Sequence, residues 1–178
     1  MFTGGGAEFT GSLARPLLIR QDVCRPGGEE AGMIERANLV GAVVAHWIYS
    51  VSILVFALRL LQMPTLGHWI GVGALVAAVP LGFLLFKGRS FDRSALYYLQ
   101  IGLMLAWLVV EFLLDWWPGI EFRQTRWIVI PYVTLFFAGA GGMIGVASLA
   151  GRGWMISAVI VFLAMGILAF VQRAMTGM

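Results

Sequence analysis

The chain has 178 residues, of which 60% are hydrophobic and only 12% are charged. A soluble domain usually has about a quarter of its residues charged, so this composition excludes an ordinary soluble fold and points to an integral membrane protein. The formal net charge is +3, but the Lys and Arg residues form no continuous patch, which argues against nucleic-acid binding. Cys24 is the only cysteine, which excludes an internal disulfide and a multi-cysteine metal site.

Residues 1–37 form a polar, glycine-rich segment that differs from the rest of the chain. It carries no apolar run long enough for a signal peptide, and its composition predicts disorder. Asn38 is expected to be the N-cap of the first helix. Met33 is an alternative start of translation, and residues 1–32 are expected to be dispensable for membrane insertion.

Residues 38–178 contain five apolar runs, each close to the roughly 20 residues that cross a bilayer as a helix. Short turn-forming sequences separate them, so successive helices are expected to be antiparallel neighbours. The sequence therefore predicts an all-α integral membrane protein: a compact bundle of five transmembrane helices with short loops and a disordered N-terminal segment. The predicted spans are 39–62, 67–86, 95–117, 127–150 and 154–172.

Small residues recur every three or four positions on two of these spans. They favour close helix contacts inside the bundle, although a dimerisation face or a sliding transporter interface has the same pattern. Pro80, within the second span, predicts a kink. The small residues are Gly67, Gly71, Ala74, Ala78 and Gly82 on the second span and Gly141, Gly145 and Ser148 on the fourth.

Lys and Arg near the ends of the spans predict the orientation. With five spans, eight of these residues lie on the side of the amino terminus and three on the other side, with Arg59 inside a span. The amino terminus is therefore expected in the cytoplasm and the carboxyl terminus outside. The expected location is the cytoplasmic membrane of a bacterium.

The stretch from Ala95 to Trp127 is expected to organise the protein, because its long apolar run carries Glu111 and Asp115. Carboxylates four residues apart share one face of a helix, and an acidic residue within a span suggests a functional site. Arg59 lies about 13 Å beyond the middle of the first span, near the depth of Asp115. The first and third spans are therefore expected to lie side by side with an ion pair between them. Together with Arg123 and Arg126, these residues form a candidate polar membrane site. It is either a structural staple or a site for an ion, a lipid headgroup or a small solute.

His46 and Tyr49 are candidate buried polar residues of the first span. Two histidines from facing helices can hold a haem, but His68 begins the second span at the opposite surface, so one chain cannot bring both to one iron. A hydrogen bond near Tyr49 or Ser50 is favoured over a haem ligated by His46 alone or shared with another subunit. No metal site and no cofactor is predicted.

The sequence contains none of the common catalytic motifs, such as HExxH, GxSxG or a Walker A lysine. The favoured function is a small non-catalytic subunit or assembly partner of a membrane complex, in contact with lipids and with other subunits or further copies of itself. One alternative is an oligomeric transporter or channel that uses the polar site. A weaker alternative is a haem-binding or lipid-modifying membrane enzyme.

Overall fold

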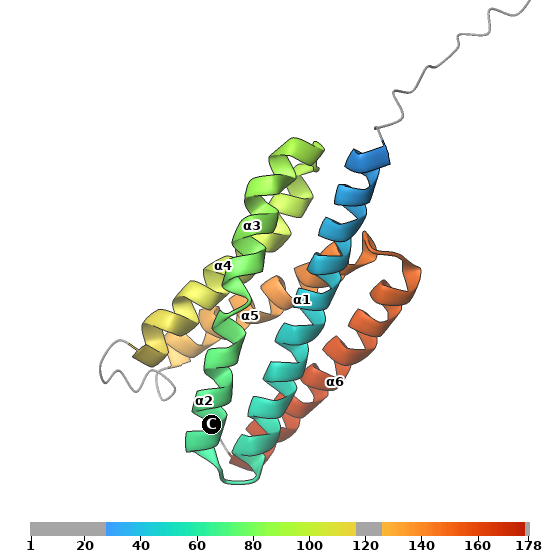
Figure 1. Ribbon diagram of the computed structural model, residues 1–178. Helices are drawn as coiled ribbons and strands as arrows, with labels where there is room; N and C mark the ends of the chain where they lie inside the picture. The colour runs from blue at the N-terminus through green and yellow to red at the C-terminus, as the bar shows by residue number, and fades with distance from the viewer. Residues whose placement is uncertain (1–27, 117–125, 177–178) are drawn as a thin grey trace, which may run out of the picture.

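The computed structural model describes residues 28–116 and 126–176, except for a few side chains at helix ends. Throughout these two ranges the chain is helical apart from short turns (Figure 1). The elements are α1 (Gly28–Leu60), α2 (Pro64–Leu75), α3 (Ala78–Gly88), the short 3-10 helix η1 (Arg89–Phe91), α4 (Ala95–Trp116), α5 (Arg126–Ser148) and α6 (Arg152–Thr176).

Five helical segments of the described chain are long and apolar enough to cross a membrane, which confirms the predicted fold class. They are Glu29–Leu60, Thr65–Phe91, Ala95–Leu114, Trp127–Ser148 and Arg152–Met175. The second of these combines α2, α3 and η1. The protein is therefore a polytopic membrane protein.

The first helix begins earlier than the sequence suggested. Asn38, expected as an N-cap, lies inside α1, which starts at Gly28 and runs for 33 residues. Met33 also lies in this helix. The physical reason is that Glu29 and Glu30 occupy the first turn of α1, where acidic side chains favour a helix start. The remainder of the N-terminal segment lies outside the described residues.

The bundle is organised around α1, not around the stretch that begins at Ala95. Helix α1 packs against α2, α3, α5 and α6, whereas α4 packs mainly against α5 and α3. Half of the most apolar part of α1 is buried within the protein, compared with 28% for Ala95–Leu114 and 11% for Arg152–Met175. Figure 1 shows α1 between the α2–α3 segment and α6. In a membrane protein an apolar run can face lipid as well as the protein interior. The long apolar run after Ala95 therefore did not identify the central helix.

Pro80 produces the predicted break in the second span. Proline has no N–H to donate to the carbonyl four residues earlier, and the helix is interrupted between Leu75 and Ala78. The Ala77 N–H donates to the Ala74 carbonyl at 3.0 Å rather than to Gly73. The Gly73 carbonyl instead accepts a hydrogen bond of 2.9 Å from the Trp47 indole of α1.

Helix α5 approaches α4 closely at three glycines. A Cβ atom added at Gly139 would lie 3.1 Å from the Met104 Cα, and one at Gly142 would lie 3.2 Å from the Gln100 Cβ. Gly145 is also covered by Gln100. Of the small residues predicted on this span, Gly145 therefore lies at the close contact with α4. A Cβ at Gly141 would instead lie 4.0 Å from the Phe162 ring, which is an ordinary van der Waals distance.

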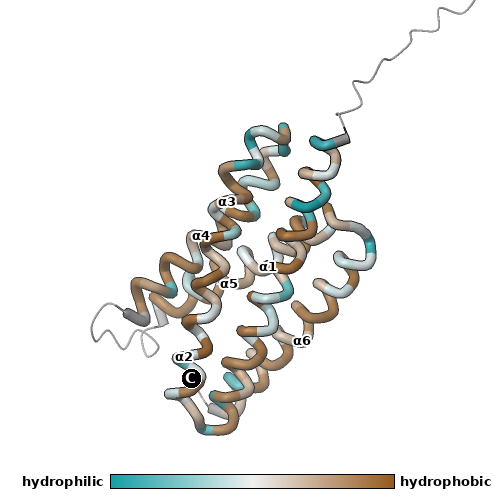
Figure 2. Tube along the Cα trace, viewed as in Figure 1, coloured by the Kyte–Doolittle hydropathy of each residue, from teal (hydrophilic) through white to brown (hydrophobic). Residues whose placement is uncertain are grey.

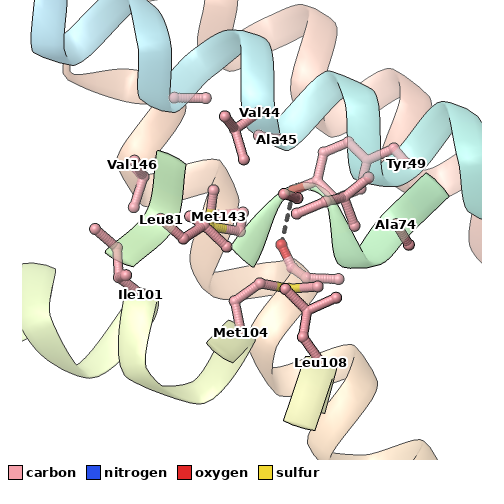
Figure 3. Packing of buried hydrophobic residues seen from close by; sticks show 14 of the residues in the cluster. Val44, Ala45, Tyr49, Ala74, Leu81, Ile101, Met104, Leu108, Met143 and Val146 are labelled. Carbon is pink, nitrogen blue, oxygen red and sulfur yellow. Dashed lines mark hydrogen bonds between the residues drawn. The ribbon is translucent and has the colours of Figure 1, made fainter. Parts of the chain in front are cut away.

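The buried cluster is apolar, and the hydropathy colouring is hydrophobic along most of the helices, with hydrophilic residues mainly toward their ends (Figure 2). Figure 3 shows how α1, α3, α4 and α5 supply large side chains to one cluster. Ser52, at 7% exposure, is the one polar residue among the described residues that are classed as buried, apart from tyrosine and tryptophan. The fully buried large side chains are Tyr49, Ile48, Leu81, Leu84, Ile101, Met104, Leu108, Met143, Met165 and Val146.

Candidate functional site

Two described residues of the predicted polar site, Arg59 and Glu111, lie toward the end of the bundle where α1 and α4 end and α5 begins. Arg59 is half-buried in the last turn of α1, and Glu111 is half-buried on α4. Asp115 and Arg126 belong to α4 and α5, but their side chains lie outside the described residues, as does all of Arg123. Two tryptophans at the same end, Trp69 and Trp127, are 64% and 87% exposed.

Tyr132 on α5 is the residue of this site that sequence reasoning missed. Its hydroxyl donates a hydrogen bond to the Glu111 carboxylate of α4, and the guanidinium of Arg59 on α1 lies within electrostatic range of it. Tyr132 therefore bonds α5 to α4 close to the end of α1. Its depth could have been counted from the sequence, because Tyr132 lies about 8 Å from the middle of the Trp127–Ser148 span. That position is in the same half of the membrane as Arg59.

Helices α1 and α4 were expected to lie side by side, but they do not. Direct contact between them is slight among the described residues, and α5 packs extensively against both. The depth argument located Arg59 near the level of Asp115, with Glu111 about 6 Å deeper, but depth along a helix says nothing about which helix is the neighbour. An ion pair between Arg59 and Glu111 stays a prediction; Tyr132 bonds to Glu111 and lies within electrostatic range of Arg59.

His46 links α1 to α6 through Nε2, while Nδ1 bonds within α1. Nδ1 lies 2.8 Å from the Ala42 carbonyl, and Nε2 lies 2.8 Å from the Ser157 hydroxyl. The Ser157 oxygen also lies 3.0 Å from the Trp154 carbonyl, and the Trp154 ring meets the imidazole edge-on at 5.3 Å between centroids. The expected hydrogen bond near Tyr49 or Ser50 is therefore replaced by one to Ser157, which is 111 residues away in the chain.

Counting protons shows that this link does not depend on the charge of the imidazole. A carbonyl can only accept, so Nδ1 carries a proton in either state. In a neutral ring Nε2 accepts from the Ser157 hydroxyl; in a charged ring Nε2 donates, and Ser157 donates to Trp154 instead. A metal or haem iron at Nε2 would have to displace Ser157.

Tyr49 is fully buried and serves as a staple between α1 and α5. Its hydroxyl donates a 2.7 Å hydrogen bond to the Ala140 carbonyl (Figure 3). Its ring meets Phe162 of α6 edge-on at 6.0 Å between centroids. The residue therefore satisfies its own polar group inside the bundle, as a buried tyrosine must.

The hydrogen bonds of Tyr132, His46 and Tyr49 attach helices to one another and favour a structural role over a catalytic one. Within residues 28–116 and 126–176, no group of three His, Cys, Asp or Glu side chains could hold a metal ion. The chain matches no protein-family model, no curated protein and no solved structure.

Proposed function

We propose that this membrane protein is a non-catalytic subunit or assembly partner of a membrane complex. The observation that carries the proposal is the use made of its polar side chains within the spans. Tyr49 bonds to α5, His46 to α6 and Trp47 to α2, all from α1. Tyr132 and Glu111 join α5 to α4. Groups that a transporter or enzyme would direct toward a ligand here attach helices to one another.

The filled interior supports the same reading. A transport pathway needs polar groups or water between the helices, whereas the space between α1, α3, α4 and α5 holds apolar side chains such as Leu81, Ile101 and Met104, all fully buried (Figure 3). At Gly139 the α4 backbone lies so close that even a Cβ atom would crowd it. If this protein takes part in transport, the pathway would lie between subunits.

Helix α6 is the helix we propose to meet a partner. Only 11% of its most apolar part is buried within the protein, and it packs on α1 and α5 alone in the main. Its outer face presents Ile160, Leu163, Ile167 and Phe170, which are 56% to 70% exposed. Their spacing of three or four residues forms a stripe that fits a neighbouring helix, and the partner is expected to be another membrane protein.

The test is purification from native membranes in a mild detergent, with the tag on the chain expressed at its natural level. We expect a second membrane protein in a fixed ratio to the chain. Ile167→Trp should reduce this ratio without changing thermal stability, because Ile167 is 66% exposed. Val79→Trp on α3, which replaces a residue 77% exposed, is the matched control and should leave the ratio unchanged.

The proposal would be wrong if the chain purified alone and, when reconstituted by itself in vesicles, carried a solute across the membrane. Equal effects of Ile167→Trp and Val79→Trp would keep the idea of a partner but remove α6 as its contact. A Soret band in the purified protein would instead favour a haem enzyme.

A further inference from the structure

The turn from α3 to α4 holds three basic residues close together at the end of the bundle where α1 begins. Lys87 lies in the last turn of α3, Arg89 lies in η1, and Arg93 follows Asp92, whose φ of 47° gives the turn its left-handed residue. The Arg93 N–H closes the turn on the Gly88 carbonyl at 3.4 Å. Figure 2 shows this hydrophilic turn beside the hydrophilic start of α1.

Arg93 is held firmly in a fixed position. Its Nη2 donates a hydrogen bond to the Asn38 side chain of α1. Its guanidinium carbon lies 5.4 Å from the Tyr97 ring centre and 6.0 Å from that of Phe91, within the range of cation–π attraction. A guanidinium has five N–H donors, and the bond to Asn38 is the one hydrogen bond it makes with a described residue.

No carboxylate among the described residues neutralises these charges. Glu35 on α1 and Asp92 in the turn are the nearest acids in sequence, but both are exposed and neither forms an ion pair with Arg93. The Nε atom of Arg93 is buried without a hydrogen-bond partner in the described chain. Because Arg93 itself is only half-buried, its outer N–H groups are open to an anion from outside the protein.

The surroundings indicate what kind of anion fits. Tyr97 and Tyr98 stand at the start of a membrane span, a level at which aromatic residues meet the headgroups. Directly beside the turn, Phe86, Leu96 and Leu99 are 79%, 60% and 57% exposed. A ligand with a phosphate at its polar end and acyl chains below would satisfy both the basic turn and this apolar surface.

We propose that this turn binds the phosphate of an anionic phospholipid headgroup. Arg93 is the preorganised anchor, because Asn38 and the two rings already fix its guanidinium, so little side-chain freedom is lost on binding. Lys87 and Arg89, which precede Arg93 in the chain, add further positive charge. The inference is independent of the proposed subunit function.

Native mass spectrometry of the full chain in neutral detergent tests the site, with phosphatidylglycerol and phosphatidylcholine as probes. We expect preferential binding of phosphatidylglycerol. Arg93→Gln should weaken this binding about fivefold, the factor that corresponds to about 1 kcal/mol per basic residue at a membrane surface. Arg93→Lys should lose less, since it retains the charge.

A second variant keeps the test valid if Arg93→Gln fails to fold. The double variant Lys87→Gln with Arg89→Gln leaves the contacts of Arg93 with Asn38 and the rings in place, and it should weaken phosphatidylglycerol binding at least fivefold. Arg152→Gln is the matched control, because Arg152 is exposed at the same end but begins α6. It should change the binding less than twofold.

Two results would overturn the proposal. An equal loss in Arg152→Gln and in the turn variants would mean that general surface charge, rather than a site, attracts the lipid. The second result is that the protein shows no preference for phosphatidylglycerol over phosphatidylcholine and that millimolar inorganic phosphate competes as effectively as the lipid. The acyl chains would then contribute nothing, and the ligand would be free phosphate.

Discussion

Replacing Gly139 by leucine should separate α4 from α5. The backbone of α4 already lies 3.1 to 3.2 Å from where the Cβ would be, about 0.3 Å closer than the 3.4 Å at which ordinary contact begins. An alanine needs only this small movement, and its better helix propensity, about 1 kcal/mol over glycine, offsets part of the cost. A leucine adds three more carbons in space that the Met104 backbone occupies. Overpacking of this kind costs about 1 to 3 kcal/mol. We therefore expect Gly139→Leu to lower the free energy of unfolding by about 2 kcal/mol, and Gly139→Ala to lower it by less than about 1 kcal/mol.

The assay is equilibrium unfolding in mixed micelles of a mild detergent and SDS, followed by tryptophan fluorescence. Trp107 of α4 is a suitable reporter, because its ring centre lies 4.8 Å from that of Phe136 on α5. Gly102→Leu is the matched control: it is on α4, and a Cβ there would meet nothing within 4 Å. If the free energies of unfolding of Gly139→Leu and Gly102→Leu differed by less than about 0.5 kcal/mol, the inference that α4 and α5 are in close contact at Gly139 would be wrong.

Three further predictions concern other parts of the bundle. Tyr49→Phe removes the buried hydrogen bond to α5 and should lower the free energy of unfolding by about 1 kcal/mol; an unchanged value would mean that this bond contributes nothing to stability. Reporter fusions after Arg89 and after Thr176 should lie on opposite sides of the membrane, the first in the cytoplasm, and finding both on one side would contradict the five-span topology. Arg59→Leu should destabilise the protein, whereas Arg59→Leu with Glu111→Leu should recover much of the stability, because replacing both partners by apolar residues is often tolerated; simply additive losses would show that the two residues are not coupled.

Membrane location, helix type and the approximate limits of the spans followed from the sequence. These features depend on the length and composition of local apolar runs, which the thickness of the bilayer selects directly. The break at Pro80 was equally predictable, because a missing N–H acts on the carbonyl four residues earlier in the same helix. The start of α1 was placed too late, at Asn38, since a polar side chain can occupy a helix interior when it has a distant partner, here Arg93.

The candidate polar site was only partly predictable. The level of Arg59 and Glu111 along their helices followed from counting residues, and the structure places both near Tyr132. Tyr132 itself was overlooked because a tyrosine in an apolar run resembles an interfacial anchor. The partner of His46 could not be deduced, since Ser157 is 111 positions away and is one of several hydroxyl groups in the spans.

What only the tertiary structure decided is which helices are neighbours. In lipid, all sides of a helix are apolar, so the stripe of hydrophobic residues that identifies the buried face of a soluble helix is absent here. Neighbours are chosen by shape, as where Gly139 admits the backbone of α4, and by single hydrogen bonds, as where Tyr49 reaches the Ala140 carbonyl. These are contacts between residues far apart in the chain. For that reason the sequence determined five spans, whereas the central position of α1 and the place of α5 between α1 and α4 came from the fold.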